Sequence, residues 1–333
     1  MMYNLIKLSK QEFDTIILNT ASRRGMSAAI IEKDFWVCIT LDYLFHHCQW
    51  KSQLAFKGGT CLSKVYHLIE RFSEDIDLIL DWRVLGYSSE EPWKERSNNK
   101  QQRFNDESKV KLFTFLKCQF LPEFVSGMRS LLGMPIKAFI EDDDLGTIVF
   151  AYPSSFKDNS ILSTIRLEIG ALASWIPLQK ATIKSFVAEE YQQIFNKSEI
   201  ELLATTVERT FWEKVTILHQ EAFRPEGSLI PSRYSRHYYD IYCMNKNGVV
   251  DSALNNPKLL EEVSNFKMKF YPRNWARYDL ARVGTVKLVP ASHSLSRLKK
   301  DYEDMKSMIY GEYPSFDEIM IVIKNIEERI NNK

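Results

Sequence analysis

The sequence lacks the features that mark several classes of protein. Its five cysteines contain no C-x-x-C pair, which argues against a disulfide frame or a zinc site and for reduced thiols. No stretch approaches 18 uninterrupted apolar residues, and residues 1–10 carry no apolar signal-peptide core, so we expect a cytoplasmic protein without a membrane span. The net charge of +1 gives the whole molecule no strong attraction to polyanions, so any such attraction must be local.

Internal repeats, low-complexity tracts and a Walker A loop are also absent. The remaining composition, 45% apolar and 26% charged, is ordinary for a globular protein, and the 13% aromatic share predicts a core rich in rings. Single cores stop growing near about 250–300 residues, so 333 residues allow one large core or two modest ones. We expect two domains, with a boundary near residue 190.

Local patterns predict the main elements. Ser9 with Glu12, and Ser315 with Glu318, fit capping boxes at the starts of two helices. Helices are expected at 9–24, 27–48 and 60–70 and from about 205 to the end; strands at 54–56, 75–80 and 160–169; a turn at 141–144; and a loop or solvated helix start at 88–111.

Two adjacent glycines, Gly58 and Gly59, separate the expected strand at 54–56 from the expected helix at 60–70. Glycine lets the backbone turn tightly and approach a ligand, and the start of a helix offers free N–H groups to an anion. Thr60 adds a hydroxyl group, and Lys64 adds a cation one turn later. The segment therefore predicts a phosphate-binding turn, although a lone Gly-Gly pair more often serves simple turn geometry.

Asp75 and Asp77 form a D-x-D motif in the next expected strand. Side chains alternate along a strand, so both carboxylates project from one face while Ile76 and Leu78 bury the other. Neighbouring carboxylates repel each other unless they share a cation, and Mg²⁺ prefers carboxylate oxygens together with phosphates. Beside a Gly-Gly turn, the motif predicts a site for Mg²⁺ or Mn²⁺ and a nucleoside triphosphate (NTP); a lone D-x-D motif favours a solvated strand edge.

A third carboxylate is available in the expected strand 160–169. Arg166 and Glu168 share one face of this strand, whereas its odd-numbered positions are mainly apolar. Glu168 is a candidate to complete a three-carboxylate, two-metal cluster with Asp75 and Asp77. An exposed Glu168 paired with Arg166 fits the sequence equally well, so both interpretations stay open.

Three stretches together resemble the AbiEii/AbiGii toxin family, the nucleotidyltransferase toxins of bacterial abortive-infection and type IV toxin–antitoxin systems, within the polymerase-β-like nucleotidyltransferases. They are EKDFWV at 32–37, FKGGTCLSKVY with RFSEDIDL at 56–78, and RTFWEKVTILHQEA with SRHYYDIY at 209–242. The resemblance covers most of the chain. Cys61 replaces a serine that many relatives carry, which should not affect the chemistry.

The resemblance implies roles for further residues. Lys214 matches the family's active-site lysine, Asp240 its second active-site acid, and Ser73 with Asp75 its Ser-x-Asp pair. Arg71, in the same motif, is expected among the nucleotide-binding residues. From the residues alone, Lys214 lies at the edge of an apolar helical stripe, which suits either a surface lysine or one that reaches a cleft. His237 is expected to be a packed or capping histidine.

Residues 267–300 contain nine Lys or Arg and one acid, with four aromatic residues interleaved. Phosphates attract the basic side chains and bases stack on the aromatic rings, so the composition suits an RNA acceptor or an NTP. For most of these residues, a solvated helical face with rings in the core is the better interpretation.

The resemblance implies an α+β fold: a polymerase-β-like nucleotidyltransferase domain at 1–190, with N-terminal helices and a small mixed sheet, and a mainly helical domain at 191–333 that completes the active-site cleft. It implies metal-dependent transfer of a nucleoside monophosphate from an NTP to an RNA (tRNA included) or protein hydroxyl, with release of pyrophosphate. A cognate antitoxin that acts without a stable complex is an expected partner. The alternative is a catalytically silent NTP- or RNA-binding module, although both acids of the D-x-D motif are present.

Overall fold

The computed structural model describes residues 2–158, 161–170, 172, 177–193, 195 and 198–333. The contacts between residues divide the chain into two units. Unit 1 comprises Met1–Val65 and Phe72–Thr205, and unit 2 comprises Tyr66–Arg71 and Thr206–Lys333. The division thus falls after Thr205, whereas the sequence suggested a boundary near residue 190.

The bounds of the elements follow the chain. Unit 1 contains helices α1 (Lys10–Arg24), α2 (Ala28–Asp42), α3 (Gly58–Lys64), α4 (Asn98–Phe115), α5 (Leu121–Leu132) and α6 (Phe186–Glu190), and strands β1 (Leu54–Lys57), β2 (Asp75–Leu80), β3 (Lys137–Ile140), β4 (Thr147–Ala151), β5 (Thr164–Gly170), β6 (Leu178–Ile183) and β7 (Ile200–Thr205). Unit 2 contains α7 (Val207–Ala222), α8 (Arg236–Lys246), α9 (Val249–Leu254), α10 (Lys258–Phe270), α11 (Ser292–Asp304) and α12 (Phe316–Asn331).

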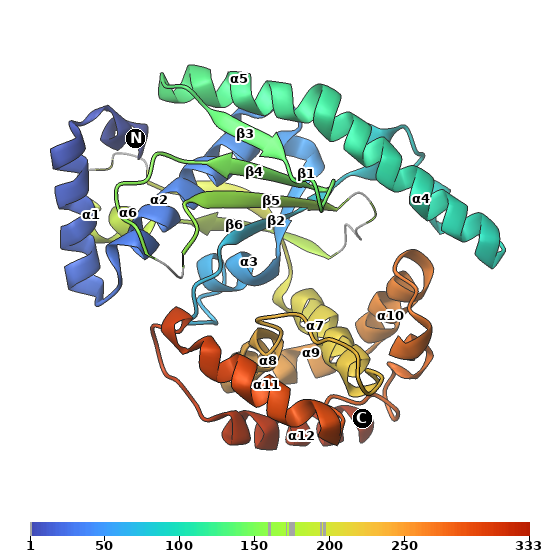
Figure 1. The fold of residues 1–333 in the computed structure, drawn as a ribbon. Coiled ribbons are helices and arrows are strands. Elements are labelled where there is room, and N and C mark those ends of the chain that lie inside the picture. Colours follow the sequence, from blue (N-terminus) through green and yellow to red (C-terminus); the bar gives the residue numbers. More distant parts are fainter. Residues whose placement is uncertain (1, 159–160, 171, 173–176, 194, 196–197) are drawn as a thin grey trace. The chain divides into compact units, whose positions relative to one another are not determined.

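The strands of unit 1 form one mixed sheet in the order β3-β4-β5-β2-β1-β7-β6 (Figure 1). Strand β2 pairs in parallel with β5 and in antiparallel with β1, which confirms the mixed sheet that the sequence predicted. Because β2 lies between these two strands, its side chains have neighbours on both sides. The D-x-D motif is therefore in the interior of the sheet and not at an edge.

The two faces of this sheet differ in character. Ile76 and Leu78 of β2 are fully buried on the face that α2 and α5 cover. On that face, Trp36 of α2 and Phe124 of α5 both meet the Phe150 ring of β4 edge-on, with ring centroids 6.3 and 5.9 Å apart. The opposite face carries the polar side chains of β2 and β5. The aromatic core expected from composition thus lies behind the strand that carries the aspartates.

The N-terminal helices begin where their caps predict. Ser9 and Glu12 form the complete capping box of α1, which ends at Gly25 with a φ of 63°. The hydroxyl of Ser27 accepts from the N–H of Ile30 and caps α2. A π-helical turn at Tyr43–His47 continues α2, so the predicted helix from 27 to about 48 is present.

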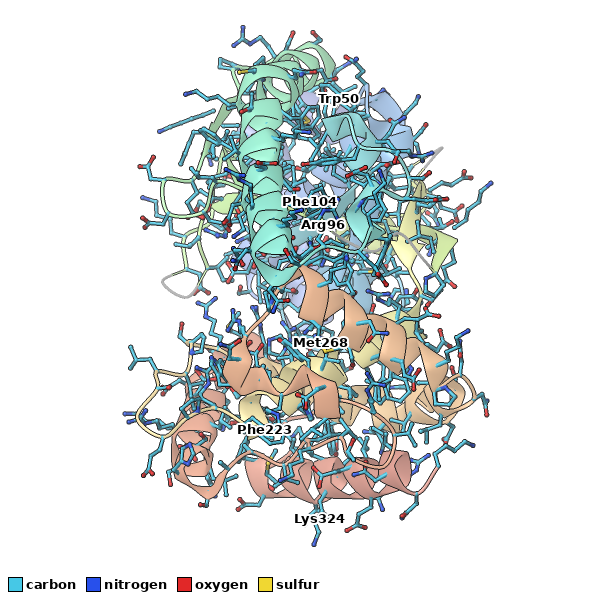
Figure 2. All side chains as sticks on the ribbon, turned by 90° about the vertical axis from the view of Figure 1, so that its right-hand side faces the viewer. Trp50, Arg96, Phe104, Phe223, Met268 and Lys324 are labelled. Carbon is cyan, nitrogen blue, oxygen red and sulfur yellow. The ribbon has the colours of Figure 1, made fainter. Side chains whose placement is uncertain are left out.

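The polar stretch 88–111 includes the first part of α4, which begins at Asn98. Just before this helix, the guanidinium of Arg96 lies 4.0 Å from the ring centroid of Phe104 in α4 (Figure 2). This contact holds the loop before α4 against the helix. A second π-helical turn at Leu116–Phe120 joins α4 to α5, which lies beside β3 (Figure 1). The acidic run 141–144 forms the predicted turn between β3 and β4.

Two predicted elements have different bounds. Helix α3 ends at Lys64, because His67 takes a left-handed φ of 52° and the next residues bond to a distant segment of unit 2. There Arg71 forms an isolated β-bridge with Ile309, and the N–H of Tyr310 donates to the carbonyl of residue 70 at 2.9 Å. The helix predicted at 60–70 was therefore too long. Strand β5 begins at Thr164, while the predicted start at residue 160 lies outside the described residues.

Unit 2 is helical in its described elements, as the sequence predicted from residue 205 onward. Helix α7 packs against α8, α9 and α10, and α8 also packs against α12. Trp212 of α7 and Tyr238 of α8 are fully buried in this core. Ser315 and Glu318 form the predicted capping box of α12. Within the described ranges, none of the helices combines the length and the apolar character needed to cross a membrane.

Candidate active site

The Gly-Gly turn lies directly against the D-x-D motif. Lys57 pairs with Asp77 across β1 and β2, so Gly58 follows the residue opposite the aspartate. Gly58 has a φ of 78°, and a Cβ built on it would lie 1.8 Å from Oδ2 of Asp77. Only glycine suits both the left-handed backbone and this close approach. The adjacency on which the predicted site depends is therefore present.

Asp75 and Asp77 project from the same face of β2. Both are partly exposed, whereas the intervening Ile76 is fully buried. The hydroxyl of Thr60 donates to the backbone carbonyl of Asp75 at 2.5 Å and fastens the first turn of α3, which also contains Gly59, to the start of β2. Ser73, two residues before Asp75, is partly exposed. The phosphate-binding roles of these residues stay predictions.

Strand β5 places Arg166 and Glu168 beside the aspartates. In the parallel pairing of β2 with β5, Asp75 lies opposite Arg166 and Asp77 lies opposite Glu168. Nε of Arg166 is 3.7 Å from both Oδ1 of Asp75 and Oε1 of Glu168, and its Nη1 donates to Glu141 at 2.5 Å. Burial alone would lower the pKa of Arg166, but the hydrogen bond and these negative charges raise it. The pairing of Arg166 with Glu168, one of the two interpretations of the sequence, is therefore present.

The donor chemistry of this face fits a divalent metal ion. Asp75, Asp77 and Glu168 supply the carboxylate oxygens that Mg²⁺ and Mn²⁺ prefer, and they lie in register on two adjacent strands. Because residue 58 is glycine, the carboxylate of Asp77 occupies the space that a Cβ would fill and lies directly against the turn. In the part of the chain that is described, no three Asp, Glu, His or Cys side chains already converge closely enough to hold a metal. The metal-binding role of these three residues thus stays a prediction.

Lys64 makes a buried ion pair with helix α2. Its Nζ lies 2.6 Å from Oδ1 of Asp34 and 4.2 Å from the ring centroid of Phe186, and the residue is only 5% exposed. Burial alone would lower the pKa of Lys64, but the negative charge of Asp34 raises it above its usual value. The ammonium group therefore stays charged. To make its predicted contact with phosphate, the ammonium group of Lys64 must either break its ion pair with Asp34 or bind both groups at once.

Three consecutive charged residues of α2 have contacts that no motif predicted. Glu32, Lys33 and Asp34 are all buried, and each bonds a different part of unit 1. Backbone N–H groups of residues 155 and 156 donate to Glu32 at 2.8 and 3.1 Å, and Lys33 donates to Glu74 at 2.7 Å. Glu74 directly precedes the D-x-D motif. The signal in the sequence is the run of three charges inside an apolar helix, since successive residues face different sides and each needs a partner there.

In unit 2, three residues with predicted roles form a buried ionic cluster. Nε and Nη2 of Arg71 donate to the two carboxylate oxygens of Asp240 at 2.7 and 2.8 Å, and Nζ of Lys214 donates to the same carboxylate at 2.6 Å. Arg71, Lys214 and Asp240 are 3%, 6% and 0% exposed. Helices α7 and α8 supply the lysine and the aspartate. The cluster thus shares one carboxylate between two cations, and the catalytic and nucleotide-binding roles of these residues stay predictions.

The charged residues of this cluster shift one another's pKa values. Burial alone would raise the pKa of Asp240, but Arg71 and Lys214 lower it below its usual value. Burial lowers the pKa of Lys214, and the charge of Arg71 adds to this effect while Asp240 opposes it. Burial also lowers the pKa of His237, whose Nδ1 has no hydrogen-bond partner among the described residues. Its ring packs edge-on against Tyr234 at 4.8 Å, which agrees with a packed histidine.

The basic and aromatic stretch 267–300 divides between the core and the surface of unit 2. Phe270 and Tyr278 are buried, Trp275 is partly exposed and Tyr271 is exposed. The exposed basic residues of the stretch are Arg273, Arg277, Arg282, Lys287, Arg297, Lys299 and Lys300. Two of the four rings therefore belong to the core, as the structural interpretation expected, while the positive charge lies at the surface. Binding of RNA or NTP to this stretch stays a prediction.

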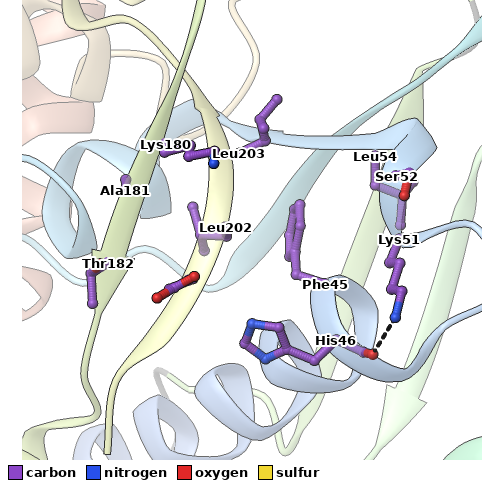
Figure 3. Close-up of a pocket in the computed structure, with 11 residues that line it drawn as sticks. Phe45, His46, Lys51, Ser52, Leu54, Lys180, Ala181, Thr182, Leu202 and Leu203 are labelled. Atoms are coloured by element: carbon purple, nitrogen blue, oxygen red, sulfur yellow. Dashed lines mark hydrogen bonds between the residues drawn. The ribbon is translucent and has the colours of Figure 1, made fainter.

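A separate cavity of about 740 Å³ lies beside β6, β7 and the turn that follows α2 (Figure 3). Phe45, Lys180 and Leu202 are among the residues that line it, and Nζ of Lys51 donates to the carbonyl of His46 at 3.0 Å at its rim. None of the predicted site residues lines this cavity. It is therefore distinct from the face that carries the D-x-D motif.

The structure thus packs the predicted Gly-Gly turn on a strand with two aspartates on one face, and the family model that matches the chain shows that it is a nucleotidyltransferase. It belongs to the AbiEii family, since the family model described as nucleotidyl transferase AbiEii toxin of type IV toxin–antitoxin systems matches residues 42–322. Among solved structures, MenT4, a nucleotidyltransferase toxin from Mycobacterium tuberculosis H37Rv, matches with a TM-score of 0.40 and 12% identity over 95% of this chain and 98% of that chain. No curated protein matches the chain.

Proposed function

We propose that this nucleotidyltransferase transfers a nucleoside monophosphate from a metal-bound NTP to a hydroxyl group of an RNA, tRNA included, or of a protein. The acceptor oxygen forms a bond to the α-phosphorus, the bond from that phosphorus to the bridging oxygen breaks, and pyrophosphate leaves as the hydroxyl proton is released. The family suggests that an antitoxin counteracts this activity; we propose that it does so without a stable complex.

The observation that carries this proposal is the contact between Gly58 and Asp77. The carboxylate lies where a Cβ of residue 58 would be, so the turn and the D-x-D motif form one continuous surface. A triphosphate bound at the turn would lie beside both aspartates of β2. Catalysis of such a transfer consists mainly of positioning and electrostatic stabilisation, which fixed strands and a tight turn supply.

The residues of this surface divide between phosphate binding, positioning of the turn and metal binding. Backbone N–H groups of Gly58 and Gly59 bind phosphate oxygens, and Thr60 keeps the turn fastened to β2 through its bond to Asp75. Asp75 and Asp77, with Glu168, would hold Mg²⁺ or Mn²⁺, which would supply charge stabilisation to the triphosphate. Ser73 is proposed to contact the phosphates from the segment before β2.

Incubation of the full chain with α-labelled NTPs, Mg²⁺, total RNA and a protein extract tests the proposal. We expect label to appear in a macromolecule with the wild type and to be absent with Asp75→Asn, because the substitution removes a negative charge that the metal requires. Asp106→Asn is the matched control, since it neutralises an exposed acid of α4 whose ion pair with a neighbouring lysine, at 3.5 Å, is also exposed.

The destination of the label separates the candidate acceptors. Label sensitive to ribonuclease identifies RNA, and label sensitive to protease identifies a protein hydroxyl. Binding of NTP by the wild type without transfer to either acceptor would favour the silent binding module. Transfer by Asp75→Asn at the wild-type rate would contradict the assignment of the site.

A further inference from the structure

Arg166 contacts three carboxylates on the face of the sheet that carries the D-x-D motif. Its Nε lies 3.7 Å from both Asp75 and Glu168, and its Nη1 bonds Glu141 at 2.5 Å. The side chain of Arg166 is 29% exposed, so it lies at the surface of this face and not in the core. Two of its three partners are residues that we propose as metal ligands.

The position of this guanidinium is built by the sheet. Arg166 lies opposite Asp75 in the pairing of β5 with β2, and Glu168 follows two residues later on the same face of β5. The N–H of Glu141 donates to the carbonyl of Thr147 at 3.0 Å, and Thr147 lies opposite Glu168 in the pairing of β4 with β5. The three carboxylates therefore reach Arg166 from three adjacent segments whose register is set by backbone hydrogen bonds.

We propose that Arg166 is the internal cation of this face and makes the binding of a divalent metal depend on nucleotide. This inference rests on the proposed function, because it assumes that Asp75 and Glu168 face the metal. Without nucleotide, Arg166 offsets part of the negative charge of these carboxylates and opposes the approach of a metal ion. When nucleotide is bound, the guanidinium N–H groups of Arg166 contact phosphate oxygens instead of the carboxylates. The carboxylates then become available to the metal.

The reason lies in the chemistry of the guanidinium. Arginine is always charged and binds phosphate and carboxylate oxygens alike, so phosphate oxygens can take the place of Asp75 and Glu168, which lie 3.7 Å from Nε of Arg166. A metal and a guanidinium near the same carboxylates repel each other at short range. Because coupling between two ligands is reciprocal, nucleotide must strengthen metal binding by the same factor by which metal strengthens nucleotide binding.

Titration of the full chain with Mn²⁺, followed by the electron paramagnetic resonance of the free ion, tests this inference with and without a non-hydrolysable NTP analogue. For the wild type we expect nucleotide to raise the Mn²⁺ affinity by about 5–150-fold, the usual range of such coupling. For Arg166→Gln we expect tighter Mn²⁺ binding without nucleotide and a coupling factor smaller than that of the wild type, because the phosphate oxygens of the nucleotide still bind the metal directly. Thermal melting of each variant verifies that it is folded.

Two further variants define the role of the charge. Arg166→Lys keeps the positive charge, so its Mn²⁺ affinity without nucleotide should stay near that of the wild type. Arg103→Gln is the matched control, because it removes the same charge from an exposed pair with Glu107 on α4 at 3.8 Å. It should leave both affinities unchanged.

The outcomes separate this inference from the proposed function. If nucleotide strengthens Mn²⁺ binding in the wild type but Arg166→Gln binds the free ion no more tightly, Arg166 is a structural ion pair and the inference is wrong. A gain equal to that of Arg103→Gln would also overturn it, since the effect would then be general electrostatics. If the wild type binds no Mn²⁺ even with nucleotide, the proposed metal site itself fails, and the role of Arg166 fails with it.

Discussion

The substitution Gly58→Ala tests the contact that carries the proposed function. It has two separable effects, since alanine at a φ of 78° is strained and its Cβ would lie 1.8 Å from Oδ2 of Asp77. The strain should destabilise the fold by about 1–2 kcal/mol. Ordinary contacts begin at 3.4 Å. The carboxylate must therefore retreat by the difference, about 1.6 Å, and a misplacement of about 1 Å costs roughly 100-fold in rate.

Gly25→Ala is the matched control for strain alone. Gly25 has a φ of 63°, a Cβ added to it would meet no described atom within 4 Å, and it also lies in unit 1. Urea unfolding followed by tryptophan fluorescence should show a loss of about 1–2 kcal/mol for Gly25→Ala and at least as much for Gly58→Ala. The kcat/KM for transfer from labelled NTP should fall by about 100-fold for Gly58→Ala and stay unchanged for Gly25→Ala.

A double variant shows whether Gly58 acts through the aspartate. Asp77→Ala removes the carboxylate atoms that lie 1.8 and 2.5 Å from the added Cβ, so Gly58→Ala should destabilise the Asp77→Ala protein less than the wild type. The reasoning is refuted if Gly58→Ala transfers nucleotide at the wild-type rate, or if its effect on stability is the same in both backgrounds and equal to that of Gly25→Ala.

Three further predictions concern the buried charges. Asp240→Asn should destabilise the protein by about 3–5 kcal/mol at pH 7. Because folding lowers the pKa of Asp240 from 3.8, the melting temperatures of the wild type and the variant should converge as the pH falls below 3.8. Lys33→Met should cost a similar amount by removing the buried cation that donates to Glu74 at 2.7 Å, and adding Glu74→Gln should recover part of the loss in urea unfolding. If the charge of Lys214 supports transfer, kcat/KM should decrease as the pH rises and Lys214 loses its proton. Because the pKa of Lys214 is lowered, this decrease should begin below pH 10.5, and Lys214→Arg should abolish it.

Features that depend on local geometry could be predicted from the sequence. The alternation of side chains along 75–80 placed Asp75 and Asp77 on one face, and the capping boxes at Ser9 and Ser315 marked the starts of two helices. Gly58 could be predicted as a turn residue because glycine takes a positive φ without strain. In each case, the determining contacts lie within a few residues of one another along the chain.

Features that depend on distant partners could not be predicted. Helix α3 ends early because Tyr66–Arg71 belongs to unit 2, where Arg71 bonds Asp240 across 169 positions of sequence. Lys64 has the spacing of a phosphate ligand, but its ion-pair partner is Asp34, thirty positions earlier on α2. The apolar periodicity of 60–70 and the position of Lys64 are equally compatible with other partners. Only the packing of each unit selects among them.

Glu168 shows why two interpretations that compete in the sequence need not exclude each other. Alternation along β5 allowed either a metal ligand or an ion pair with Arg166, and the pair is present at 3.7 Å. Carboxylates gathered on one face need a cation in every state of the enzyme, because their mutual repulsion does not depend on whether substrate is bound. A metal can meet this need only while it is bound. The ion pair and a metal-binding role of Glu168 are therefore compatible, and the metal-binding role stays a prediction.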